Sequence, residues 1–175
     1  RSMMSGGKGI VGYNVQTAVD TKHHLIVAHE VTNEGHDRYQ LSSMAEQARE
    51  AMKLESISVV ADKGYFKSEE ILACHKAGIT AYVPKAMTSG AKFDGRFNND
   101  AFLYDSARDV YICPAKEVLT WRSSSIEKGM TLHRYWTNNC EGCALKSQCT
   151  PGRERRVRRW EHEAVLEEMQ VRLNN

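Results

Sequence analysis

The amino-acid sequence predicts an α/β fold that combines one antiparallel hairpin with strands joined by helices. Three observations support this prediction. Residues 11–32 alternate between β-forming and other residues, two later segments carry apolar residues at helical spacing, and two short apolar runs accompany those segments. The resulting order of strand, strand, helix, strand, helix, strand over residues 11–85 is that of a layered α/β protein.

The hairpin consists of two predicted strands, at 11–19 and 24–32. In the first strand, β-forming side chains occupy every second position: Val11, Tyr13, Val15, Thr17 and Val19. This alternation is typical of a strand with one buried face. The intervening residues 20–23 (Asp-Thr-Lys-His) favour a turn, so we expect the two strands to pair antiparallel.

Two pairs of a helix and a strand follow the hairpin. A helix is predicted over 38–53, because its apolar residues lie three or four positions apart: Leu41, Met44, Ala45, Ala48 and Met52. The β-branched run at 57–61 is typical of a buried strand. A second helix over 68–78 starts at a serine and stops at a glycine. It leads to a strand over 80–83 that ends before Pro84.

The sequence changes character beyond residue 85. We expect residues 1–10 to be a linker, 11–85 to be the central α/β layer, 86–157 to be a loop and cysteine-rich insert, and 158–175 to be a helix that returns toward the core. Short β-like pieces of the insert surround its aromatic residues: Tyr104, Tyr111, Trp121, Tyr135 and Trp136. We expect the insert to have little apolar mass of its own.

The composition indicates a soluble globular protein. Of the 175 residues, 41% are hydrophobic and 26% are charged, with 3 Pro and 12 Gly, which excludes disordered and collagen-like classes. The net charge is +2, but residues 111–175 carry 11 basic and 8 acidic groups. The sequence has neither a run of ~18 apolar residues nor a signal-peptide pattern, so we expect a cytoplasmic protein. The opening Arg1 and the linker-like start indicate a piece of a longer chain.

Asp62 is the first candidate functional residue. It directly follows the apolar run 57–61 and precedes Lys63-Gly64-Tyr65. In α/β folds, ligands and catalytic groups gather at the carboxyl ends of strands. An aspartate in this position also commonly binds turn amides, and the spacing alone does not separate the two roles.

Four cysteines within 37 residues form a second candidate site: Cys113, Cys140, Cys143 and Cys149. Their number and the Cys-x-x-Cys spacing match a structural zinc site. The alternative in a reducing cytoplasm is four unligated cysteines that serve packing. His133 and His162 are substitute ligands if Cys113 lies elsewhere. Cys74, on the apolar side of a predicted helix, is expected to be buried and unreactive.

A basic run between residues 153 and 159 is the third candidate site. It holds five arginines in seven residues: Arg153, Arg155, Arg156, Arg158 and Arg159. Such a run is either a solvated face or a set of contacts to nucleic-acid phosphates. In both cases we expect the side chains to be exposed.

A set of short motifs, taken in this order along the chain, resembles the DDE transposases of bacterial insertion sequences. The motifs are Gly12–Asp20 (GYNVQTAVD), Val31–Asn33 with His36-Asp37, Val60–Phe66 (VADKGYF), Tyr82–Lys85, Tyr104-Asp105, Cys113–Ala115, Cys140–Cys143 with Lys146 and Cys149-Thr150, and Arg159–Glu163. Each motif is weak alone, but together they span nearly the whole chain. We expect the loop that holds His36-Asp37 to cap the helix that follows it.

The resemblance implies an RNase H-like catalytic domain that cleaves DNA and transfers its strands. Three carboxylates of such domains hold two Mg²⁺ or Mn²⁺ ions. Asp62 matches the second aspartate of this triad. The first aspartate belongs to a strand that precedes the hairpin, and the glutamate belongs to a helix after the cysteine segment. Neither motif is evident in residues 1–175, so Asp20 and Glu163 are only substitute candidates: Asp20 suits a turn and Glu163 a solvated helix face.

The resemblance also implies the partners of the protein. They are the insertion-sequence ends and the target DNA. We expect no membrane as a partner, and a homo-oligomer is compatible with the family. This piece alone is expected to be inactive. Two alternatives stay open, namely a non-catalytic zinc-stabilised module for DNA binding or assembly, and an RNase H-like nuclease without strand transfer. The DNA sequence recognised, the target preference and the oligomeric state are not readable from the sequence.

Overall fold

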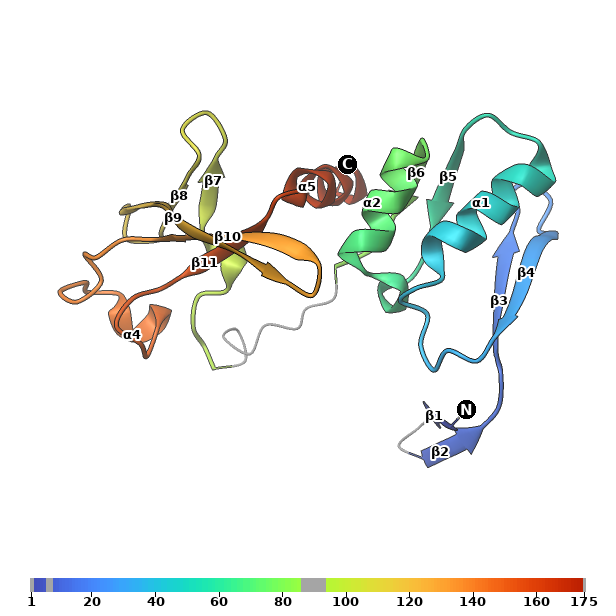
Figure 1. Cartoon of the computed structure of the whole chain (residues 1–175), viewed down its shortest axis with the longest axis horizontal. Helices are drawn as coiled ribbons and strands as arrows, with labels where there is room; N and C mark the ends of the chain where they lie inside the picture. The colour runs from blue at the N-terminus through green and yellow to red at the C-terminus, as the bar shows by residue number, and fades with distance from the viewer. Residues whose placement is uncertain (1, 6–7, 86–93, 175) are drawn as a thin grey trace. The chain divides into compact units, whose positions relative to one another are not determined.

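The structure, a computed structural model, describes residues 2–5, 8–85 and 94–174 of the chain (Figure 1). The chain divides into two compact units, which are residues 1–86 with 164–175 and residues 87–163. The first unit mixes strands with helices, and the second is built on one antiparallel sheet. This mixture confirms the predicted α/β class.

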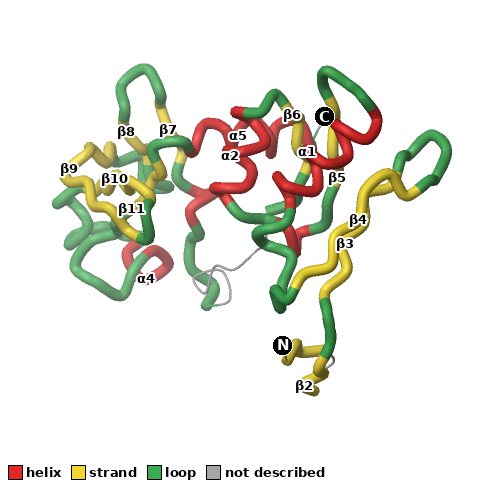
Figure 2. The backbone as a smooth tube through the Cα atoms, turned by 45° about the vertical axis from the view of Figure 1, so that its right-hand side comes forward, coloured by secondary structure: helices red, strands yellow, loops and turns green. Residues whose placement is uncertain are grey.

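The first unit contains three separate pairs of strands. Its strands are β1 (Ser2–Ser5), β2 (Lys8–Val11), β3 (Asn14–Val19), β4 (Ile26–Thr32), β5 (Ile57–Val60) and β6 (Ile79–Tyr82). The first two pairs, β1–β2 and β3–β4, are antiparallel, and the third, β5–β6, is parallel. Figure 2 shows β3 running beside β4. The predicted hairpin and the predicted later strands are thus confirmed. The parallel pairing fits the crossover through a helix.

Residues 2–11 differ from the linker that the sequence predicts for 1–10. Ser2 pairs with Val11 and Ser5 with Lys8, so that β1 and β2 form a short hairpin. A two-stranded hairpin is held by backbone hydrogen bonds and needs no hydrophobic period, which explains why the pattern did not reveal it.

Three helices pack on these strands, and each places an apolar stripe inward. They are α1 (Leu41–Met52), α2 (Ser68–Lys76) and α5 (Glu163–Leu173). Their buried residues are Leu41, Met44, Ala45 and Ala48 in α1, Ile71 and Cys74 in α2, and Leu166 and Met169 in α5. The buried position predicted for Cys74 is confirmed. Helix α5 lies against the end of β6, where the Gln170 amide donates a hydrogen bond to the carbonyl oxygen of Val83 (3.3 Å).

Within the described residues, the β3–β4 and β5–β6 pairs are separate two-stranded sheets and do not join into one mixed sheet. A groove of about 570 Å³ separates β3 from β5, and apolar residues of α1 line it as well. Val60, in the run expected to be buried, is 80% exposed, and Val19 is 51% exposed. Both side chains line the groove, which leaves them exposed.

The second unit is a five-stranded antiparallel sheet in the order β11-β10-β9-β8-β7. Its strands are β7 (Leu103–Asp105), β8 (Val110–Ile112), β9 (Val118–Glu127), β10 (Met130–Trp136) and β11 (Val157–Trp160), with the short helix α4 (Lys146–Cys149). All five aromatic residues that mark the predicted β-like pieces lie in strands. The core of this unit consists of Phe102, Tyr111, Leu119, Tyr135 and Val157. The expectation of little apolar mass was therefore wrong.

The helix predicted over 158–175 begins later than expected. Val157–Trp160 is strand β11, paired with β10, and α5 starts at Glu163. The arginines concealed the strand in the sequence, although Val157 and Trp160 are buried in the sheet. Within the described residues, no helix is long and apolar enough to cross a membrane.

Candidate functional site

Asp62 lies directly beyond the carboxyl end of β5. The backbone N–H of the preceding residue, Ala61, still donates to the carbonyl oxygen of Tyr82 on β6. Asp62 then caps the single 3₁₀ turn η1 (Lys63–Tyr65), and its Oδ1 accepts a hydrogen bond from the Gly64 N–H (2.6 Å). A Cβ on Gly64 would lie 2.8 Å from that oxygen, so any other residue at this position would have to displace the carboxylate. The Asp62 side chain is exposed at this end of the strand.

A second carboxylate, that of Asp37, flanks the same glycine. Its Oδ2 would lie 3.7 Å from a Cβ on Gly64, and Asp62 Oδ1 would lie 2.8 Å from the same Cβ. Asp37 belongs to the loop between β4 and α1, which the sequence predicts only as a helix-capping loop. The fold therefore brings together two acids that are 25 positions apart in the sequence.

Two amides of β3 hold the Asp37 carboxylate in place. Its Oδ1 accepts hydrogen bonds from Asn14 Nδ2 and from Gln16 Nε2, both at 2.7 Å. Gln16 is only 2% exposed, and its Nε2 also donates to Asn14 Oδ1 (2.9 Å). Because Oδ1 is engaged by both amides, the carboxylate is oriented with Oδ2 toward Gly64.

Tyr65 connects this network back to the turn that carries Asp62. Its hydroxyl donates to Gln16 Oε1, which leaves neither end of the buried amide unpaired. Burial raises the pKa of Tyr65 above its usual value, and the negative charges of Asp37 and Asp62 add to this effect. The hydroxyl thus stays protonated as a donor at neutral pH.

Asp20, a substitute candidate for the triad, is a turn residue in the structure. It follows the last residue of β3, whereas the Asp62 turn contacts Gln16 near the first, about 13 Å away along the strand. Its carboxylate accepts hydrogen bonds from the Lys22 and His23 N–H groups, at 3.2 and 2.8 Å, and contacts His23 Nδ1 (2.7 Å). These hydrogen bonds, those to the two backbone N–H groups above all, lower the pKa of Asp20.

Glu163, the other substitute candidate, is the first residue of α5. A carboxylate there complements the positive end of the helix dipole. Within the described residues, no group of three or more His, Cys, Asp and Glu side chains is arranged to hold a metal ion.

The four cysteines of the second unit line one small cavity of about 30 Å³. All four are free thiols, and Cys113 and Cys149 pack against the aromatic core. Burial raises the pKa of Cys149, and the three other sulfurs add to this effect, while Arg155 opposes it. By contrast, Cys74 lies in the first unit, where burial raises its pKa to about 12.

The arginine run divides over several environments, because strand alternation sends neighbouring side chains to opposite faces. Arg159 is 8% exposed, which corrects the expectation of an exposed run. Its guanidinium lies 3.7 Å from the centre of the Tyr104 ring. Arg155 donates to Asn99 Oδ1 (2.9 Å), and Arg156 pairs with Glu154 (2.7 Å) and lies over Trp136. Only Arg153, Arg156 and Arg158 of the run are exposed.

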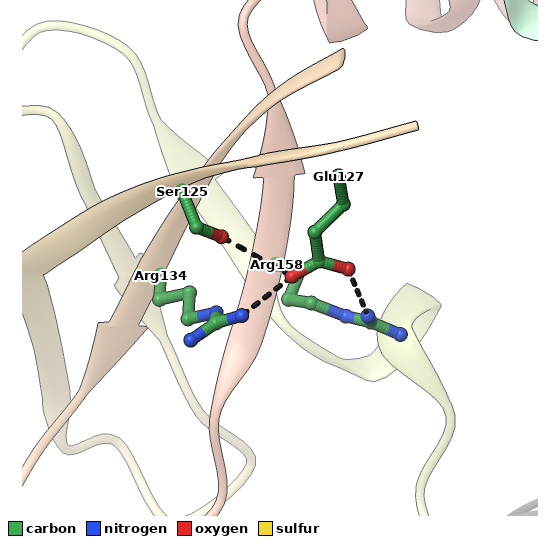
Figure 3. Close-up of polar contacts among 4 residues, drawn as sticks. All are labelled: Ser125, Glu127, Arg134 and Arg158. Carbon is green, nitrogen blue, oxygen red and sulfur yellow. Dashed lines mark hydrogen bonds and ion pairs between the residues drawn. The ribbon is translucent and has the colours of Figure 1, made fainter. Parts of the chain in front are cut away.

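Arg134 of β10 is a basic residue that the sequence reading missed. It pairs directly across the strands with Arg158 of β11. One carboxylate, that of Glu127, contacts both guanidiniums and also accepts a hydrogen bond from the Ser125 hydroxyl (Figure 3). These hydrogen bonds, that of Arg134 first, together with the two positive charges lower the pKa of Glu127. No local pattern marks Arg134, since only the pairing register brings it beside Arg158.

The comparison with protein families assigns this α/β chain, with its two carboxylates near a strand end, to a family. Residues 1–166 match the family model described as "Transposase DDE domain". The chain therefore belongs to the DDE transposase family, as its motifs indicated. No curated protein and no solved structure gives a match to this chain.

Proposed function

We propose that this chain is part of the catalytic domain of an insertion-sequence transposase, which cleaves DNA and transfers the strands with the help of Mg²⁺ or Mn²⁺. The observation that carries this proposal is the exposed Asp62 carboxylate at the end of β5, with the Asp37 carboxylate beside it, in a chain of the DDE transposase family. DNA is the substrate and partner in this proposal.

The chemistry of the two acids fits a hard divalent cation. Mg²⁺ and Mn²⁺ prefer carboxylate oxygens, and each aspartate directs an oxygen toward Gly64. Bound metal ions would supply activation of the attacking oxygen and stabilisation of the leaving oxygen. Asp62 is assigned to hold the metal, and the amides of Asn14 and Gln16 keep Asp37 in a fixed orientation next to it.

The rest of the acid set is assigned by family resemblance. The first aspartate comes from a strand that precedes the hairpin, and the glutamate from a helix after the cysteine segment. Asp20 is the weaker substitute, because its turn already engages the carboxylate. Glu163 is retained as a candidate for the glutamate.

The groove between β3 and β5 supports an RNase H-like assignment in which one more strand completes a mixed sheet. The groove is lined by both strands, and neither strand has a pairing partner on that side within the described residues. A strand there would cover Val60 and Val19 and would end beside Asp62. On this proposal the 175 residues are a fragment of the complete domain.

We also assign a structural Zn²⁺ to Cys113, Cys140, Cys143 and Cys149. Support comes from their common cavity and from the match of four thiolates to a closed tetrahedral site. Zinc binding would draw the sulfurs closer together than they lie without the metal. Because the second unit has its own aromatic core, the metal would add stability to a module that already folds.

Two measurements test the catalytic proposal. In the first, Mn²⁺ binding to the chain is followed by electron paramagnetic resonance. Asp62→Asn should abolish the bound signal, while Asp20→Asn should leave it unchanged, because Asp20 lies at the far end of β3. In the second, Asp62→Asn in the transposase that contains this chain should reduce transposition by at least ~10²-fold.

The alternatives predict different results. Transposition that continues at the parental rate with Asp62→Asn would favour a non-catalytic zinc-stabilised module for DNA binding or assembly. DNA cleavage that depends on Asp62 but never yields joined strands would favour an RNase H-like nuclease.

A further inference from the structure

One face of the β9–β10–β11 sheet holds two arginines in an arrangement that favours oxyanion binding. Arg134 and Arg158 are direct cross-strand partners, and Ser123 is the partner of Arg134 on the other side. Like charges directly opposite each other destabilise a sheet unless an anion lies between them. Glu127 supplies that anion, and Figure 3 shows its carboxylate between the two guanidiniums.

The charges of this pair are only half neutralised. One carboxylate faces two guanidiniums, and the Arg158 side chain remains 61% exposed while Arg134 is 33% exposed. Arg156, which directly precedes β11, lies over the Trp136 ring (4.8 Å) and is paired with Glu154. This part of the chain thus holds three arginines against two glutamates, with the Ser125 hydroxyl beside Glu127.

Phosphate is the anion that this arrangement fits best. A guanidinium fork binds phosphate oxygens through two parallel hydrogen bonds, and two forks on adjacent strands can share one phosphate. Serine hydroxyls are common additional donors to the phosphates of DNA. The contact of Glu127 with both forks demonstrates that the pair accommodates an oxyanion in the absence of DNA.

We propose that Arg134 and Arg158 bind the phosphate backbone of duplex DNA, and that Glu127 is an internal competitor which the phosphate displaces. The choice of DNA as partner rests on the proposed function. The interaction surface is then the face of a sheet rather than the linear run 153–159, since Arg159 of that run is buried and Arg155 is engaged with Asn99.

The test is the binding of the full chain to a fluorescent DNA duplex, measured by anisotropy over a series of salt concentrations. Arg134→Gln and Arg158→Gln should each weaken binding by ~3- to 10-fold and reduce the slope of log K against log salt by about 0.9. Glu127→Gln should strengthen binding by ~3- to 10-fold, because the competing carboxylate is removed.

A matched control separates this effect from a general change in net charge. Asp105 forms an exposed ion pair with Arg108 (2.7 Å) in the same unit, so Asp105→Asn removes the same charge as Glu127→Gln. It should change DNA affinity by less than 2-fold, roughly the effect of one distant screened charge. Arg134→Lys, which keeps the charge but loses the fork, should bind with intermediate affinity, and thermal melts establish that each variant is folded.

Several results would overturn the proposal. The first is an equal gain in DNA affinity from Glu127→Gln and Asp105→Asn. The second is parental DNA affinity in the folded Arg134→Gln and Arg158→Gln variants. The third is the lack of salt-sensitive DNA binding by the parent chain. The proposed function is tested separately by the Asp62→Asn measurements, since Asp62 belongs to the other unit. Normal salt-dependent binding without Asp62-dependent catalysis would therefore contradict the proposed function alone.

Discussion

The two units of this chain differ in whether their strands join into one sheet. In the described part of residues 87–163, which starts at residue 94, every strand belongs to one five-stranded sheet around an aromatic core. In the first unit the strands form separate pairs, and Val60 is left 80% exposed beside a groove. The unit that holds Asp37 and Asp62 is thus the one whose strands stay in separate pairs, whereas the strands of the other unit are joined in one sheet.

The largest expected effect is seen when a core residue of the second unit is compared with an exposed strand residue of the first. Tyr135, which is 1% exposed and donates to Asp109 Oδ1 (2.7 Å), anchors the complete sheet. Tyr135→Ala should lower the free energy of unfolding by ~3–5 kcal/mol through the cavity it leaves. Val60→Ala in the open unit should change it by less than ~0.5 kcal/mol. Denaturant titration measures both, and similar losses would show that the open unit is as well packed as the closed one.

Zinc binding should stabilise the second unit and leave the first unit unchanged. If the four cysteines bind zinc, metal at about 100 times its Kd should stabilise this unit by ~2.7 kcal/mol. Amide hydrogen exchange should slow in β8–β11 and stay unchanged in β3–β6. Cys143→Ser should remove the effect, and elemental analysis of protein purified without chelator should find about one zinc per chain. Protein without zinc would leave the cysteines as packing residues.

Asp109 gives the complete unit a specific acid sensitivity. Hydrogen bonds from the Tyr135 and Tyr104 hydroxyls lower the pKa of Asp109. A lowered pKa in the folded state means that this stabilisation is complete above the pKa of the unfolded chain, near ~3.9, and is lost as the pH falls through the lower folded value.

The matched variant for this prediction is Asp109→Asn, since asparagine also tolerates the positive φ of 51° at this position. It should cost about 1 kcal/mol at pH 7 and flatten the acid limb of stability against pH. Thermal melts from neutral to acidic pH measure this, and parallel curves for parent and variant would contradict it.

The smallest expected effect is an absence of activity. The chain of 175 residues should not nick supercoiled DNA with Mg²⁺ or Mn²⁺, because the proposed acid set is incomplete without the two outer carboxylates. Nicking that Asp62→Asn abolishes would show that the outer acids lie within these residues. Asp37 and Glu163 would then be the first to substitute.

The sequence predicted the local elements of the first unit well. Periodicity located the hairpin, helices α1 and α2 and strands β5 and β6, since each depends on neighbouring residues. It missed β11 because five of the seven residues at 153–159 are arginines, and periodicity measures only the spacing of apolar residues.

The contacts of the candidate sites were less predictable. Asp62 was found from its place at the end of an apolar run, but Asp37 was expected only to cap a helix. Its approach to Gly64 depends on which loop the fold brings to which strand end, and no local pattern contains that information. The same holds for Arg134, whose partner is set by the register between β10 and β11.

The open edges of β3 and β5 also have a consequence for the chain in a crowded cell. Unpaired N–H and C=O groups along a strand are a template for β-pairing with any extended polypeptide, and exposed valines beside them increase the adhesion. Separated from a strand that fills the groove, this unit is therefore a target for self-association and for chaperones that bind extended apolar segments. As the protein concentration rises, this unit should aggregate while the aromatic sheet of the other unit stays folded.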